Sequence, residues 1–208
     1  DAKIHKQWFG RTVIHSDRRF SYEEAQERIE TQEGDLTTEI LQLDKLAKIL
    51  RAERIRNGAI TFDRSEVRFN LDENSKPIGV YFKVSKDSNH LIEEFMLLAN
   101  KKVSEFISLN KRNEPTGNTF IYRIHDDPDP AKLTALRDFV GTFGYKMDLA
   151  NTQTVAQSLN RLLSDVKGKG EENMIETLAM RSMSKAVYST NPIGHYGLGF
   201  ESYSHFTS

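Results

Sequence analysis

The stretch at residues 91–107 reads LIEEFMLLANKKVSEFI. Its apolar residues recur three and four positions apart, which is the spacing of one face of an α-helix. These residues are Leu91, Ile92, Phe95, Met96, Ala99, Val103, Phe106 and Ile107. The pattern predicts a long helix whose apolar stripe is buried against a sheet.

The strands of this sheet are predicted in segments that come before and after the helix in the sequence. Val67, Phe69 and Leu71 alternate with polar residues, and residues 78–84 do the same after the turn-rich stretch DENSKP. This alternation predicts a β-hairpin. Two further strands are expected, at residues 7–15 (QWFGRTVIH) and 120–125 (FIYRIH).

Two helices are predicted in the first quarter of the chain. The capping-box sequence Ser21-Tyr22-Glu23-Glu24 opens a short helix that Gly34 stops. Apolar residues from Leu36 to Leu50 then recur at helical spacing up to a basic turn ahead of Asn57-Gly58. This second helix should have about five turns.

Three more helices are predicted after residue 128. Asp129-Pro130 supplies a cap and a first turn for one, and Val155 to Leu163 mark the next. Apolar positions from Ile175 to Val187 mark the third. Because strands and helices intermix without regular alternation, we predict an α+β fold, with a mainly antiparallel sheet packed by several long helices.

Composition is that of an ordinary globular protein. The 208 residues are 28% charged and 38% hydrophobic, which favours one compact body. The net charge of −1 gives no global basic field of the kind that many nucleic-acid binders use. The chain lacks cysteine, so a reducing cytoplasm fits, and it has no apolar run near the roughly 20 residues needed to span a membrane.

The residues alone indicate no metal centre. The six histidines include no HExxH motif and no pair at helical ligand spacing. Asp126, Asp127 and Asp129 could hold Mg²⁺, but the interleaved prolines are more typical of a strand-to-helix turn. The glycine-rich segment GHYGLGF does not open a helix as a phosphate-binding loop must.

Three side chains could contact a nucleotide, although each also has an ordinary structural interpretation. Phe62 and Tyr22 could offer an aromatic face or a hydroxyl to a base or ribose, but most aromatic residues simply pack. Glu93, like Glu94, could accept hydrogen bonds from a ligand hydroxyl, but a solvated helix face is the default for both.

Four segments together resemble the catalytic RNB domain of the ribonuclease R/ribonuclease II family, and the ribonuclease R type more closely. They occur in the family's order and cover essentially the whole chain, residues 1–208. A fifth segment, YRIHDDP, also resembles its counterpart. The four are GAITFDRSEVRFNLDE, LIEEFMLLAN, IETLAMRSMSKAVYST and GHYGLGFESYSHFTS.

The resemblance implies a processive 3′-to-5′ exoribonuclease that binds single-stranded RNA, depends on Mg²⁺ and releases nucleoside monophosphates. It implies that Phe62 stacks on a base, and that Tyr22 and Glu93 sense the ribose hydroxyls. His195 lies in a signature segment, and we favour a structural role for it.

The family's aspartate cluster precedes the part that corresponds to Asp1, and its arginine-containing segment follows HFTS. We therefore expect a partial RNB domain without catalytic or metal-binding residues of its own, from a cytoplasmic parent that is monomeric and not membrane-bound. Two alternatives stay open. The chain could be a non-catalytic RNA-binding or scaffold descendant of the family, or a piece that keeps only folding elements and binds nothing.

Overall fold

The computed structural model describes residues 2–62, 66–110, 112 and 114–207. Contacts divide the chain into two compact units. Unit 1 comprises Asp1–Ala52 and Asp63–Phe95, and unit 2 comprises Glu53–Phe62 and Met96–Ser208. The division falls within two helices, α2 (Thr37–Arg56) and α3 (Asp87–Ser108).

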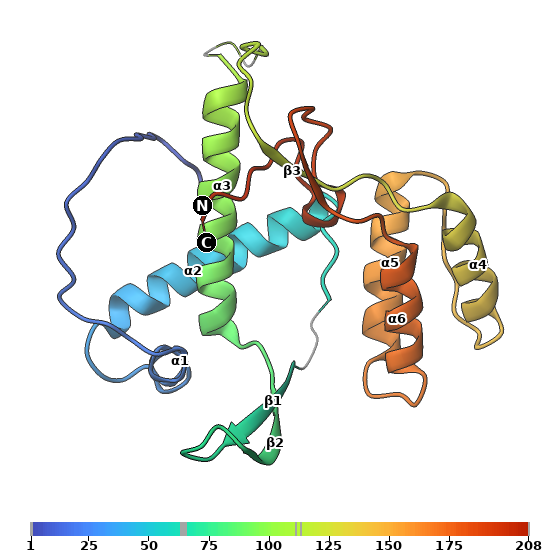
Figure 1. Ribbon diagram of the computed structural model, residues 1–208, viewed down its shortest axis with the longest axis horizontal. Helices are drawn as coiled ribbons and strands as arrows, with labels where there is room; N and C mark the ends of the chain where they lie inside the picture. Colours follow the sequence, from blue (N-terminus) through green and yellow to red (C-terminus); the bar gives the residue numbers. More distant parts are fainter. Residues whose placement is uncertain (1, 63–65, 111, 113, 208) are drawn as a thin grey trace. The chain divides into compact units, whose positions relative to one another are not determined.

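Unit 1 contains α1 (Tyr22–Thr31), most of α2, the hairpin strands and the first turns of α3 (Figure 1). The predicted capping box at Ser21 is confirmed, since its hydroxyl accepts a hydrogen bond from the Glu24 N–H. The α1 helix ends at Thr31, and its C-cap Gln32 adopts the left-handed conformation two residues before the predicted stop at Gly34. The long second helix is also confirmed, as α2.

The predicted hairpin is confirmed as β1 (Glu66–Leu71) and β2 (Pro77–Lys83), which pair antiparallel. Val67 lies opposite Phe82, and Phe69 lies opposite Val80, so apolar side chains share one face of the hairpin. The Asp72 carboxylate accepts hydrogen bonds from the N–H groups of Asn74 and Lys76, and these bonds close the turn.

The predicted strand at residues 7–15 is wrong. This segment has no regular secondary structure, and most of its apolar side chains are exposed, with Val13 and Ile14 at 102% and 85%. Alternation alone does not make a strand, because its backbone groups need a neighbouring strand with which to pair.

The apolar stripe of α3 is less buried than its pattern predicted. Leu91 is buried, but Ile92, Met96 and Phe106 keep exposed fractions of 43%, 39% and 57%, whereas Leu97, which the predicted stripe did not include, is buried. Adjacent apolar residues such as 91 and 92 lie about 100° apart around a helix, so they cannot all point into one interface. The prediction that the whole stripe is buried against a sheet is therefore wrong.

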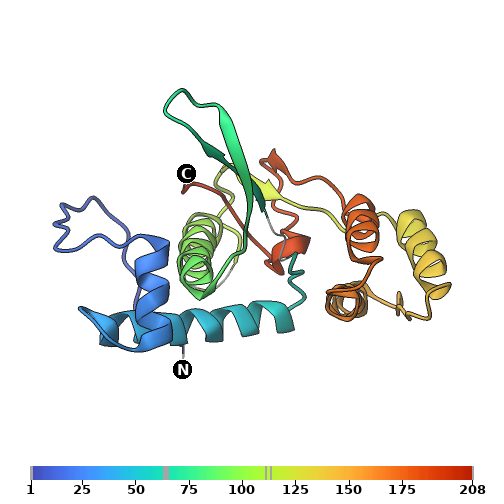
Figure 2. The same cartoon turned by 90° about the horizontal axis from the view of Figure 1, so that it is seen from below.

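Unit 2 is built around three helices, α4 (Pro130–Gly141), α5 (Thr152–Val166) and α6 (Glu172–Ser182). The α6 helix packs on both of the others (Figure 1 and Figure 2). Together they form the main core. Its members include Leu133, Leu136, Val140, Val155, Ala156, Leu159, Leu162, Val166, Ile175 and Ala179.

The strands of unit 2 are β3 (Tyr122–Ile124) and β4 (Val187–Ser189), followed by a short 3₁₀ helix, η1 (Tyr196–Leu198). The predicted last helix is too long, because Val187 belongs to β4 and lies opposite Ile124 of β3. Pairing with a distant strand therefore decides the structure of this segment.

The α+β class is confirmed. In the described part of the chain, six α-helices accompany two antiparallel pairs of strands, β1 with β2 and β3 with β4. No helix among these described residues has both the length and the apolar character needed to cross a bilayer.

Candidate nucleic-acid interface

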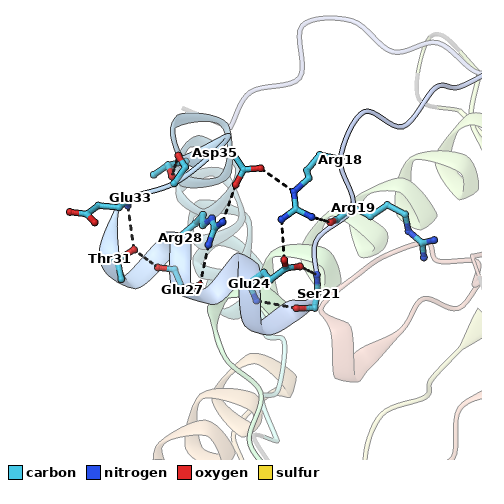
Figure 3. Close-up of polar contacts among 11 residues, drawn as sticks. Arg18, Arg19, Ser21, Glu24, Glu27, Arg28, Thr31, Glu33 and Asp35 are labelled. Atoms are coloured by element: carbon cyan, nitrogen blue, oxygen red, sulfur yellow. Dashed lines mark hydrogen bonds and ion pairs between the residues drawn. The ribbon is translucent and has the colours of Figure 1, made fainter.

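The N-terminus of α1, where Tyr22 is the first helical residue, is held by a network of charged side chains (Figure 3). The Glu24 carboxylate accepts a hydrogen bond from the backbone N–H of Ser21 at 2.8 Å and another from the Arg18 guanidinium at 3.0 Å. The Ser21 N–H and then the Arg18 guanidinium lower the pKa of Glu24. The carboxylate that caps the helix therefore stays charged near neutral pH.

The same network ties α1 to the start of α2 through Asp35. Arg18 and Arg28 both donate to the Asp35 carboxylate, at 3.0 and 2.9 Å. Arg28 and then Arg18 lower the pKa of Asp35. Because both arginines share one carboxylate, the backbone before Tyr22 is fixed to the turn that follows α1 (Figure 3).

Tyr22 is 42% exposed on this fixed helix end. The ammonium of Lys83, at the end of β2, lies 5.7 Å from the centre of the Tyr22 ring. A cation at this distance is attracted to the ring face. Tyr22 therefore combines a held backbone with an accessible side chain, as a ligand contact requires.

Glu93 lies in the first half of α3, and its side chain is 46% exposed. One carboxylate oxygen is 3.2 Å from the His90 Nδ1 atom and 3.8 Å from an Arg51 nitrogen. The carboxylate is thus oriented by its neighbours and still reachable from solvent.

The expectation that Glu93 and Glu94 share a solvated helix face is wrong for Glu94. Only 3% of Glu94 is exposed, and its carboxylate lies 3.6 Å from the Arg51 guanidinium. A buried carboxylate needs such a cation, since an unpaired charge is costly to remove from water.

Phe62 lies in unit 2, whereas Tyr22 and Glu93 both belong to unit 1. It is partly exposed and packs against the helical core of unit 2. The backbone just before it is buried, with Ala59 and Ile60 exposed by 0% and 7%. The buried residues that precede Phe62 therefore hold its backbone in place.

His195 precedes η1 and is packed between two aromatic rings. Its ring centre lies 5.0 Å from that of His125 and 5.4 Å from that of Tyr203, both nearly edge-to-face. Burial, and secondarily the neighbouring His125, lowers the pKa of His195 to about 4. The imidazole is therefore neutral at pH 7, with its Nδ1 atom buried and lacking a hydrogen-bond partner among the described residues.

His125 is a residue that sequence reasoning missed, and it organises the GHYGL segment. Its Nδ1 atom accepts a hydrogen bond from the Gly197 N–H at 3.0 Å, and its Nε2 atom lies 2.8 Å from the Ser184 carbonyl oxygen. The backbone of His125 also bonds to Gly194 and Tyr196. These partners are about 60 to 70 positions away in sequence, so no local pattern indicates them.

The GHYGLGF segment lines a cleft of about 790 Å³ in unit 2. Four carboxylates contribute to its walls, from Glu105, Asp126, Asp127 and Glu201, against the single lysine Lys101. Carboxylates thus outnumber lysines in the lining of this cleft, and Lys101 is itself paired with Glu105 at 3.8 Å.

The acidic stretch at 126–130 forms the predicted strand-to-helix turn. The Asp129 carboxylate accepts hydrogen bonds from the N–H groups of Ala131 and Lys132 and so caps α4. In the described ranges, no three His, Cys, Asp or Glu side chains gather in a way that could hold a metal ion.

Comparison with known proteins gives concordant results. A family model described as the RNB domain matches residues 1–208. A DIS3-like exonuclease 2 from Schizosaccharomyces pombe is 34% identical over 99% of this chain and 24% of its own length. A ribonuclease R from Aquifex aeolicus is 31% identical over 95% of this chain and 28% of its own length.

The fold is also similar to that of a solved protein. The structure of Mycoplasma genitalium RNase R in complex with ribose methylated single-stranded RNA has a TM-score of 0.74 and 27% identity. The match covers 91% of this chain and 30% of that one. The chain therefore spans about a quarter to a third of the proteins it matches.

Proposed function

We propose that this chain, which belongs to the RNB-domain family, is part of a processive 3′-to-5′ exoribonuclease that hydrolyses single-stranded RNA to nucleoside 5′-monophosphates. The observation that carries the proposal is the family match over residues 1–208. The fold shared with an RNase R bound to single-stranded RNA supports it. The proposal concerns the whole protein, because its relatives are about four times as long as the matched part.

Mg²⁺ is the cofactor that we propose for the whole enzyme. The described residues do not fit this ion, because no three potential ligands converge among them. In the family that this sequence resembles, the aspartate cluster comes before the part that corresponds to Asp1. We therefore assign the metal to that region and no catalytic residue to this chain.

Tyr22 and Glu93 are proposed to contact ribose hydroxyls. A 2′-hydroxyl can donate to a carboxylate and accept from a phenol, and it is the group that distinguishes RNA from DNA. The exposure of both side chains supports this role, as do the capped helix end at Tyr22 and the contacts that orient the Glu93 carboxylate.

Phe62 is proposed to stack on a base. Stacking on an aromatic ring tolerates every base, as an enzyme that degrades RNA without sequence preference requires. The partly exposed ring on a buried backbone segment supports this role.

His195 is proposed to be structural. A neutral imidazole packed between His125 and Tyr203 holds the loop before η1, and the part of its ring that stays exposed lines the cleft of unit 2. We further propose that the whole protein is a cytoplasmic monomer that is not bound to membranes. The absence of cysteine from this chain is consistent with a reducing compartment.

The experiment that tests the proposal measures release of nucleoside monophosphate from single-stranded RNA and from DNA of the same sequence. The whole protein should degrade the RNA in the presence of Mg²⁺ and stop when the metal is chelated. The 208-residue chain alone should release nothing. Inactivity of the whole protein would favour a non-catalytic descendant, and activity of the chain alone would mean that the metal site lies within it.

A further inference from the structure

Asn160 is an amide on the core helix of unit 2. The α5 helix presents Val155, Ala156, Leu159, Leu162, Leu163 and Val166 to the interior. Asn160 lies next to Leu159 in this sequence and is itself only partly exposed. Burial of an amide among apolar side chains is unfavourable unless both its oxygen and its nitrogen find partners.

The partners of Asn160 are the backbone groups directly before Phe62. Its Nδ2 atom donates to the Ala59 carbonyl oxygen at 2.8 Å, and its Oδ1 atom accepts from the Thr61 N–H at 3.0 Å. The Thr61 hydroxyl makes a longer contact with the same oxygen, at 3.4 Å. One side chain therefore satisfies an acceptor and a donor two residues apart, much as a neighbouring strand would.

The same backbone segment is held again by η1. The Ile60 N–H donates to the Gly197 carbonyl oxygen at 3.0 Å. A Cβ atom at Gly199 would lie 2.8 Å from the Ala59 nitrogen, which shows how closely η1 packs on this segment. Each of the three residues before Phe62 is thus fixed by a hydrogen bond or a close contact.

From this geometry we infer that Asn160 is a positioning residue, which orients the Phe62 ring for stacking on an RNA base. The inference rests on the proposed function, because it takes Phe62 as the stacking residue. Asn160 acts through the backbone at residues 59–61 and does not touch the RNA.

The hydrogen bonds of Asn160 distinguish a positioning role from a purely stabilising one. The bonds of Asn160 reach residues about 100 positions away and converge on the segment that carries Phe62. A residue that acts through Phe62 should matter only while the Phe62 ring is present, whereas a residue that only stabilises the fold should matter in either background.

The test is a double-mutant cycle in the whole protein, with a single-stranded RNA oligonucleotide as the probe. Four proteins are compared: the parent, Asn160→Ala, Phe62→Ala and the double variant. Binding is measured as the Kd for RNA, and turnover as separate kcat and KM values. Gln157→Ala removes an exposed amide from the same helix and serves as the matched control.

Phe62→Ala should raise the Kd for RNA about tenfold, as expected for the loss of one stacked base. Asn160→Ala should raise the Kd for RNA and the KM about fivefold and should change kcat by no more than about twofold. In a protein that already carries Phe62→Ala, the same substitution should leave Kd and KM almost unchanged. Asn160→Asp keeps an acceptor for Thr61 but places a carboxylate oxygen against the Ala59 carbonyl oxygen, so it should weaken RNA binding at least as much as Asn160→Ala does. Thermal melts limit the comparison to variants that are folded at the assay temperature.

Equal losses from Asn160→Ala in both backgrounds would overturn the positioning role and leave the stacking role of Phe62 intact. Unchanged RNA binding by Phe62→Ala would overturn the stacking role itself. Should Asn160→Ala not fold, Asn160→Asp in both backgrounds gives the same comparison.

Discussion

His195 illustrates how its surroundings set the chemistry of a single side chain. Burial between His125 and Tyr203 lowers its pKa from 6.5 to about 4, so the folded protein keeps it neutral. In the unfolded chain the same imidazole takes up a proton below about pH 6.5. Acid therefore favours the unfolded state, since that state binds more protons.

We expect the chain to lose stability as the pH falls from 6.5 towards 4, and a His195→Gln variant to lose less over this range. Above pH 6.5 the histidine is neutral in both states, so its titration contributes nothing there. The difference between the two proteins should reach on the order of 2–3 kcal/mol near pH 4. Urea unfolding at several pH values measures it, and parallel curves for the two proteins would contradict the lowered pKa.

A second residue-scale prediction concerns sugar discrimination by Glu93 in the whole protein. Glu93→Gln keeps the shape of the side chain but removes its charge, so it should weaken the hydrogen bond accepted from a ribose hydroxyl. The preference for RNA over DNA should fall about three- to tenfold. The ratio of the Kd values for RNA and DNA of the same sequence measures this effect.

The control for Glu93→Gln is Glu23→Gln, which removes the same charge from an exposed position of α1. A similar loss of RNA preference in both variants would indicate a general charge effect. It would contradict a specific contact between Glu93 and the ribose.

At the scale of elements, the start of α4 was predicted correctly from a two-residue sequence signal. Asp129 and Pro130 were predicted to begin this helix, and the Asp129 carboxylate does accept hydrogen bonds from Ala131 and Lys132. Asp129→Ala should lower the free energy of unfolding by about 1 kcal/mol. Asp138→Ala, at an exposed position of the same helix, should have a smaller effect in the same denaturant titration.

The packing of η1 gives a prediction with a close control. Gly199 and Gly117 both have positive φ values, of +66° and +73°. An added Cβ at Gly199 would lie 2.8 Å from the Ala59 nitrogen, whereas one at Gly117 would have no atom of the described residues within 4 Å.

Both Gly→Ala variants should lose about 1–2 kcal/mol of unfolding free energy, because alanine is strained in the left-handed conformation. Gly199→Ala should lose at least about 1 kcal/mol more, because backbone atoms must move to admit the methyl group. Thermal or urea unfolding compares the two variants. Equal losses would mean that η1 does not pack tightly on residues 57–59.

The elements that were predicted correctly are those whose signals lie within a few residues. The capping box at Ser21, the alternation from Val67 to Leu71 and the Asp129-Pro130 pair each act on their immediate neighbours. The failures at residues 7–15 and at Val187 have a different origin, because strand formation depends on a partner far along the chain.

At the scale of the whole molecule, the candidate site could be predicted only through resemblance to a family. Composition and charge gave no indication of RNA binding, and the roles of Tyr22, Phe62 and Glu93 remain predictions. Asn160 and His125 could not be found from sequence, because their hydrogen bonds join segments about 60 to 100 positions apart. Only the folded chain brings these groups together.

The most direct measurement of the proposed activity follows the two ends of one RNA separately. The purified whole protein is incubated with Mg²⁺ and a single-stranded RNA labelled at either its 3′ or its 5′ end. We expect the 3′ label to appear at once as nucleoside 5′-monophosphate, while the 5′ label passes from full-length RNA to a short end product with little RNA of intermediate length. Early release of the 5′ label, internal cleavage products or intact RNA would contradict a 3′-to-5′ exoribonuclease.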